Sequence, residues 1–181
     1  MAKYFDINAY ELLEKTFGGS GYDIAAAFQE SPFIYQNANP YDPTITPCEI
    51  WNELTTQIYF VYLGKKQNTN KGIIYYREKV KKSFSNIVVM NAISDLFLTA
   101  KNLNTFNQAI QEHEYFVSKQ LQLKRAKDLY FKDYWGEVKS LGAWGGDFVM
   151  VTHDGPEEAL MTYMNKKDFS VVIPFRQMIK L

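Results

Sequence analysis

The sequence predicts an α+β fold, in which an antiparallel sheet is backed by helices. Strand-like and helix-like segments mix along the chain without the regular strand–helix alternation of a parallel sheet. The clearest strand is 57–63, a β-branched and aromatic run closed by Gly64. A clear helix is 105–123, whose apolar residues recur at helical spacing. With 181 residues the chain can bury a core, and we expect 1–181 to form one domain.

Local signals mark the elements of the amino-terminal part. Asn8, with Glu11 three residues later, predicts a capped helix that ends at Gly18. A second helix is expected from about residue 22 to 29, before Pro32, and a strand at 33–36. The segment 37–47 carries three prolines and is expected to be a loop or an irregular edge.

The remaining elements follow in order along the chain. A polar, basic turn is expected at 64–71, and the segment 70–101 predicts two helices with a break near residues 85–86. Strands are expected at 147–152 and 170–175. Between them, Pro156 and two glutamates predict the start of a helix.

Composition excludes several classes of function. Twenty basic and twenty acidic residues give no net charge, which argues against a nucleic-acid or membrane-surface binder. Cys48 is the single cysteine, so no internal disulfide is possible and a reducing, cytoplasmic setting is expected. His113 and His153 lack metal-ligand spacing, so we expect no metal site, with His113 on a helix face and His153 in a turn. Residues 1–15 contain no apolar h-region and no apolar run approaches 18 residues, so neither a signal peptide nor a membrane span is expected.

The first glycine-rich run, 18–25, places a carboxylate at the expected start of a helix. Glycine permits positive φ and a close approach of the backbone to a ligand. Asp23 follows at the start of the helix, where the amides and the helix dipole stabilise a negative charge. Two interpretations stay open: Asp23 serves phosphate chemistry, or it only caps the helix. Ser20 either binds a phosphate oxygen or closes the turn.

The second glycine-rich run, 139–147, precedes a strand and not a helix. It therefore fits neither the dinucleotide-binding fingerprint nor the P-loop. Its residues alone also allow a bulge or a tight turn at a sheet edge. Lys65, Lys66 and Lys71 cluster after a strand, where they either attract an anionic substrate or lie in a solvated turn.

Together, the two glycine runs resemble the carboxyl-terminal half of the GHMP kinases. The similarity is greatest to the phosphomevalonate kinase-like branch, and within it to the bacterial subgroup with a Gly-Tyr-Asp-Ile-Ala motif, here 21–25. Segments 62–69 and 111–114 also resemble that family, and the likeness spans about 8–180. The resemblance implies a ferredoxin-like domain of an ATP-dependent small-molecule kinase. The implied acceptor is a hydroxylated or phosphorylated carboxylic acid of the isoprenoid type.

The resemblance also implies roles for individual residues. Asp23 matches the catalytic aspartate of the family, which orients or deprotonates the acceptor or balances charge during transfer of the γ-phosphoryl group. Trp144 stands where the family usually has glycine, so the second loop is expected to be bulkier. The residues expected to bind substrate or to form the phosphate loops are Gly19, Ser20, Gly21, Lys65, Lys66, Gly142, Ala143, Gly145 and Gly146.

The nucleotide phosphate loop of the family belongs to an amino-terminal domain, and the residues before Gly18 do not resemble it. We therefore expect ATP and Mg²⁺ to serve the complete kinase, and no cofactor to bind tightly to this chain alone. The expected partner is the missing amino-terminal kinase domain or a second copy of the chain, besides a small-molecule substrate. The alternative is a non-catalytic binding or assembly module that retains the fold.

Overall fold

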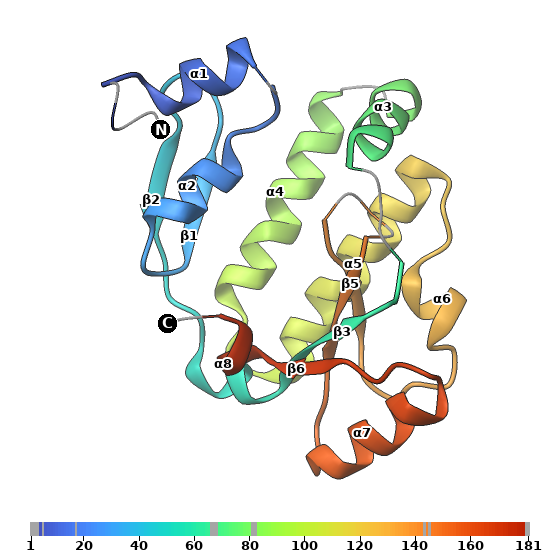
Figure 1. The fold of residues 1–181 in the computed structure, drawn as a ribbon. Coiled ribbons are helices and arrows are strands. Elements are labelled where there is room, and N and C mark those ends of the chain that lie inside the picture. Colours follow the sequence, from blue (N-terminus) through green and yellow to red (C-terminus); the bar gives the residue numbers. More distant parts are fainter. Residues whose placement is uncertain are drawn as a thin grey trace. The chain divides into compact units, whose positions relative to one another are not determined.

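The chain divides into two compact units, within Met1–Ile50 and Trp51–Ile179 (Figure 1). The computed structural model describes residues 4, 6–16, 18–65, 69–80, 83–142, 144 and 146–179, with the backbone alone at 69–71, 73 and 77. That residues 1–181 form a single kinase-type domain stays a prediction.

The first unit contains two short helices and a β-hairpin. Its elements are α1 (Ala9–Lys15), α2 (Tyr22–Phe28), β1 (Phe33–Gln36) and β2 (Thr44–Pro47). The strands pair antiparallel, with Phe33 opposite Pro47. In place of the loop or irregular edge expected over 37–47, the last four residues of this segment form the paired strand β2. Pro47 is tolerated in this strand because the N–H of the next residue, Cys48, donates to the carbonyl of Pro32, and the N–H groups of successive residues in a strand point to opposite edges.

The two helices of this unit begin as the sequence predicts. The Asn8 side chain caps α1 by accepting hydrogen bonds from the backbone N–H groups of Tyr10 (2.9 Å) and Glu11 (3.1 Å). Gly21 precedes α2 with φ 76°. A Cβ at Gly21 would lie 2.8 Å from the ring of Tyr10 and 3.0 Å from the hydroxyl oxygen of Tyr35. Both the backbone and the packing therefore require glycine at this position.

The second unit is built on a four-stranded antiparallel sheet. Its strands are β3 (Ile58–Tyr62), β4 (Val138–Ser140), β5 (Phe148–Thr152) and β6 (Val172–Pro174). They lie in the order β4-β5-β3-β6, and each neighbouring pair is antiparallel. Strand, helices, two strands, helix and strand in this order form the split β-α-β arrangement of ferredoxin-like folds. The predicted α+β class is confirmed.

Helices connect and cover these strands (Figure 1). They are η2 (Asn52–Thr56), α3 (Thr69–Lys79), α4 (Phe84–Thr99), α5 (Leu103–Leu121), α6 (Ala126–Tyr130), α7 (Glu157–Lys166) and α8 (Phe175–Met178). Alternate residues of β3 enter two separate hydrophobic clusters. One cluster contains Tyr59 and Val61 with Leu160 and Met164 of α7. The other contains Ile58 and Phe60 with Phe106 and Ile110 of α5.

Several local expectations are corrected by the structure. The break between α3 and α4 lies before Ser83, whose hydroxyl caps α4 by accepting from the N–H of Asn86, and not near residues 85–86. The start of the second glycine run is not part of a loop, because residues 138–140 pair with β5 and form strand β4. His153 lies in the connection between β5 and α7, but it is buried: its Nδ1 accepts from the Trp135 indole and its Nε2 donates to the carbonyl of Pro156.

The close packing around Gly21 predicts a position-specific effect of alanine. Gly21→Ala meets both a left-handed backbone, which disfavours alanine by roughly 1–2 kcal/mol, and an overlap that adds about 1–3 kcal/mol. Gly18→Ala is the matched control, because Gly18 has φ 65° but a Cβ added there would meet no other atom within 4 Å. Urea unfolding should show the larger loss of stability for Gly21→Ala. Equal losses in the two variants would contradict the packing argument.

Candidate functional site

Asp23 and Ser20 lie in the first unit, at the start of α2. Gly21 occupies the N-cap position, and Asp23 lies in the first turn with its side chain exposed. Asp23 is therefore not the N-cap residue. Ser20 closes the turn: its hydroxyl accepts from the N–H of Tyr22 (3.3 Å), and its carbonyl accepts from the Tyr35 hydroxyl and the Asn37 amide. The Asp23 carboxylate thus faces solvent from the first turn of α2, directly after a turn that Tyr35 of β1 anchors through the carbonyl of Ser20.

The second glycine loop lies in the second unit, between β4 and β5. Gly142 has φ 64° and Trp144 has φ 46°. The backbone at Trp144 thus has a left-handed conformation that glycine favours, although the side chain is an indole. Gly146 is buried, and a Cβ there would lie 2.7 Å from the carbonyl oxygen of Leu141. Ala143 and Gly145 lie outside the described residues.

Lys65 follows β3 and is directed to an aromatic ring. Its Nζ lies 3.3 Å from the hydroxyl oxygen of Tyr130, to which it donates, and 5.1 Å from the centroid of that ring. Gly64, with φ 70°, makes the turn that precedes it. Lys66 lies outside the described residues. Of the predicted lysine pair, Lys65 therefore has a described position, beside Tyr130.

A cavity of about 450 Å³ lies beside the second glycine loop. Its lining includes Trp144 of the glycine loop and Tyr130, the contact of Lys65. The full lining is Leu63, Gln122, Leu123, Lys124, Ala126, Leu129, Tyr130, Ser140 and Trp144. Within the second unit, Trp144 therefore lines this cavity and Lys65 contacts one of its wall residues, whereas the predicted residues Lys65, Gly142 and Gly146 are not among the lining. Asp23 and residues 19–21 belong to the first unit, and their approach to this cavity stays a prediction.

A buried carboxylate beneath the loop was missed at the level of sequence. Glu114 of α5 is 2% exposed, and its Oε2 accepts a hydrogen bond from the Ser140 hydroxyl (3.0 Å). Its Oε1 lies 3.4 Å from Nδ1 of His113, and neither atom has a hydrogen-bond partner among the described residues. Burial lowers the pKa of nearby Lys139, and the charge of Glu114 opposes that effect. The sequence feature that could have revealed this carboxylate is a charged residue one helical turn after Ile110, on the apolar face of α5.

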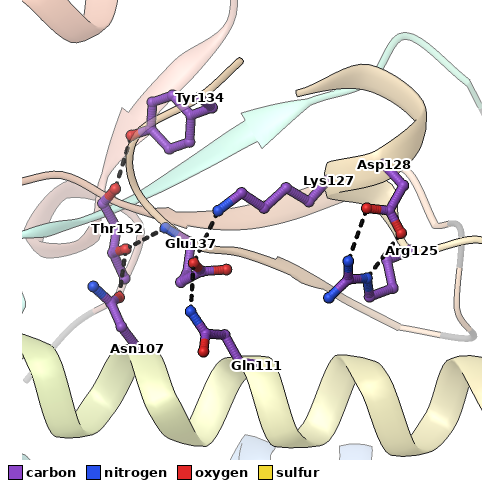
Figure 2. A network of polar contacts seen from close by, with 8 residues as sticks. All are labelled: Asn107, Gln111, Arg125, Lys127, Asp128, Tyr134, Glu137 and Thr152. Carbon is purple, nitrogen blue, oxygen red and sulfur yellow. Dashed lines mark hydrogen bonds and ion pairs between the residues drawn. The ribbon is translucent and has the colours of Figure 1, made fainter. Parts of the chain in front are cut away.

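A second polar network ties α5 to the segment before β4 (Figure 2). Glu137 Oε1 accepts from the Gln111 amide and from Lys127 Nζ, each at 2.8 Å. The Thr152 hydroxyl accepts from the N–H of Glu137 and donates to the Asn107 side chain. This network borders a larger cavity of about 630 Å³ that is lined by charged residues. Lys127 and Arg125 in that cavity already bind Glu137 and Asp128, so the network is structural.

Two features are absent from the described residues. No helix among them is long and apolar enough to cross a membrane. No group of three or more histidine, cysteine, aspartate or glutamate side chains in the same part of the chain could hold a metal ion.

Comparison with known proteins identifies the class of fold. No protein-family model matches the chain, and a search of curated proteins finds no match. Solved structures do match in fold. The structure of a Lin0012 protein from Listeria innocua has a TM-score of 0.63 at 16% identity, covering 88% of this chain and 54% of that chain.

A second solved structure is an L. major mevalonate kinase in complex with R-mevalonate. It has a TM-score of 0.58 at 14% identity, covering 88% of this chain and 53% of the kinase. The chain therefore shares its fold with part of these two structures, and it spans about half the length of either one.

The Glu114–Ser140 hydrogen bond predicts a cost for removing the hydroxyl. Ser140→Ala leaves Oε2 of a buried carboxylate without that donor, so the free energy of unfolding should fall by about 1–3 kcal/mol. Ser94→Ala is the control, because the exposed Ser94 hydroxyl bonds to a carbonyl of its own helix. Chemical denaturation measures both. Equal stability of Ser140→Ala and the unchanged protein would show that the bond contributes nothing.

The contact of Asp133 with Lys167 and Tyr163 predicts an acid-shifted titration. Hydrogen bonds from these two side chains lower the pKa of Asp133 from 3.8 to about 2. Because the folded-state pKa is depressed, the stabilisation is present above pH 3.8 and is lost as the pH falls toward about 2. Carbon-detected NMR should show Asp133 still ionised at about pH 3. Lys167→Met should move the midpoint upward, whereas Lys166→Met, its exposed neighbour, should not.

Proposed function

We propose that the chain is the carboxyl-terminal, substrate-side domain of an ATP-dependent small-molecule kinase of the GHMP type. The reaction is transfer of the γ-phosphoryl group of ATP to a hydroxyl or phosphate acceptor. The observation that carries the proposal is the antiparallel unit with a glycine loop between β4 and β5, in a chain whose fold matches a mevalonate kinase. The resemblance of residues 18–25 and 139–147 to the same family points independently to this class.

The proposed roles follow from the chemistry of phosphoryl transfer. That reaction depends on positioning and on neutralising the charge of the transferred group, with Mg²⁺ and backbone amides holding the phosphates. Asp23 would orient the acceptor hydroxyl or take its proton, and its exposed carboxylate is accessible for this role. The loop 142–146 and the lysines at 65 and 66 would bound the acceptor. Mg²⁺ and ATP would be held by a second domain, and the setting would be cytoplasmic.

The proposal requires Asp23 and the glycine loop to line one site, although they belong to different units. A nitroxide attached at Asp23→Cys, in a Cys48→Ser background, tests this directly. Paramagnetic broadening of the amide signals of Gly142 and Gly146 supports a shared site. Absence of broadening there, with broadening within 18–37, would overturn it and favour a non-catalytic binding or assembly module.

Activity gives the second test, with Asp23→Asn as the central variant. In the product of the complete reading frame that contains this chain, turnover with ATP should fall by about 10²–10⁴, the range for loss of a proton-transfer group. The fold and stability should be unchanged, because Asp23 is exposed and does not cap α2. Glu30→Gln, an exposed carboxylate of the same unit, is the control and should retain full turnover.

Turnover is measured as ADP release with a panel of small hydroxylated and phosphorylated carboxylic acids. Wild-type turnover in Asp23→Asn would remove Asp23 from the mechanism. Residues 1–181 alone should neither hydrolyse ATP nor bind Mg-ATP tightly. Calorimetry that showed tight binding to this segment would contradict the assignment of the nucleotide site to a second domain.

A further inference from the structure

The cavity beside the glycine loop has an apolar lining that the fold does not fill. Six of its lining residues are apolar or aromatic: Leu63, Leu123, Ala126, Leu129, Tyr130 and Trp144. Leu123 is 37% exposed and Leu129 is 50% exposed, so a large part of this lining is left in contact with water. Small-molecule sites are concave, mainly apolar and roughly 300–1,000 Å³ in volume, with a few polar groups that orient the ligand. The cavity of about 450 Å³ meets this description.

The charged groups at this cavity are cationic. Lys124 lines it, and Lys65 contacts its Tyr130 wall. Neither lysine forms an ion pair with another described residue, and no carboxylate is among the described lining. The larger cavity near α6 differs, because Arg125 and Lys127 are already bound to carboxylates there. The smaller cavity is therefore complementary to an anion.

Trp144 gives this cavity a flat wall. The side chain is half-buried, and its ring lies 6.4 Å from that of His113, with an angle of 31° between the planes. A ring supported in this way is restricted in orientation. Aromatic rings contribute about 0.5–1.5 kcal/mol beyond area burial when they pair with another ring. A glycine at this position would leave space for polar groups to approach the backbone, whereas the indole favours contact with a flat apolar body.

We propose that this cavity binds a small amphiphilic anion. A flat apolar body would lie against Trp144 and Tyr130, and a single carboxylate, sulfonate or phosphate group would reach Lys124 and Lys65. The inference rests on the proposed function in one respect: it takes the bound anion to be the acceptor of the proposed kinase. The binding claim itself depends only on the cavity.

The test uses 8-anilinonaphthalene-1-sulfonate as the probe, with protein labelled by ¹⁵N at tryptophan. Titration should be saturable, and the indole N–H signal of Trp144 should shift while those of Trp51 and Trp135 stay in place. Trp144→Gly removes the flat wall and also relieves the left-handed backbone, so it should fold while Kd rises about tenfold. Trp51→Phe, which alters an indole outside this lining, should bind the probe normally.

Removing the two lysine charges tests whether the cavity recognises the anionic group of the probe or only its apolar body. Lys65→Met combined with Lys124→Met should weaken binding of the sulfonate roughly three- to tenfold, as expected for exposed ion pairs. The neutral probe N-phenyl-1-naphthylamine should be unaffected by the two changes. Lys119→Met, an exposed lysine of α5, is the control. Equal affinity of the unchanged protein for the neutral and the sulfonated probe would overturn the proposal, as would unchanged sulfonate binding by Trp144→Gly.

The proposed kinase activity and the proposed ligand class of the cavity can be overturned independently of each other. Saturable binding of the probe at Trp144 without any phosphoryl transfer by the complete protein would overturn the kinase and leave the ligand class of the cavity standing. Phosphoryl transfer without binding of the probe would overturn the ligand class and leave the kinase standing.

Discussion

Strand β3 is the element on which the second unit depends, because it is hydrogen-bonded along both edges and covered on both faces. It pairs with β5 over five residues and with β6 over three. Its alternate side chains supply two clusters, one completed by α7 and the other by α5. Since side chains of a strand alternate, a shift of one residue in register would exchange the two sets. The register of β3 therefore decides which helix covers which face.

Strand β4 lies at the edge of the sheet, where one partner strand gives it less support. Helix α5 compensates with two polar contacts, one at either end of this short strand. Gln111 donates to Glu137, directly before the strand, and Glu114 accepts from Ser140, its last residue. Residues three apart on a helix share a face, so one side of α5 reaches both positions. The glycine loop thus leaves the sheet from a strand that α5 holds at both ends.

The loop that follows combines a glycine-like backbone with a bulky side chain. At Trp144 the left-handed conformation persists, and the indole closes one side of an apolar cavity with two lysines nearby. Such a loop is better suited to bounding the body of a small molecule than to cradling phosphate oxygens by its amides. This agrees with the proposed function, in which this loop bounds the acceptor and a second domain holds the nucleotide.

Much of the fold follows from short stretches of sequence. The spacing in 57–63 and 105–123 predicts β3 and α5, and Asn8 predicts the cap of α1, because periodicity and capping depend on residues within a few positions of one another. The glycines at 21 and 142 and lysine 65 could likewise be singled out from local pattern. What those residues contact could not be predicted from that pattern.

Tertiary structure alone decided the remainder. Three residues form β4 because β5 pairs with them, and His153 is buried because Trp135 and Pro156 satisfy its ring nitrogens. Ser140 and Glu114 are 26 positions apart, and Lys65 and Tyr130 are 65 apart. Contacts between such distant segments depend on how helices pack on the sheet, and no local pattern encodes them. The cavity at Trp144, with its apolar lining, Lys124 and the nearby Lys65, results from that packing.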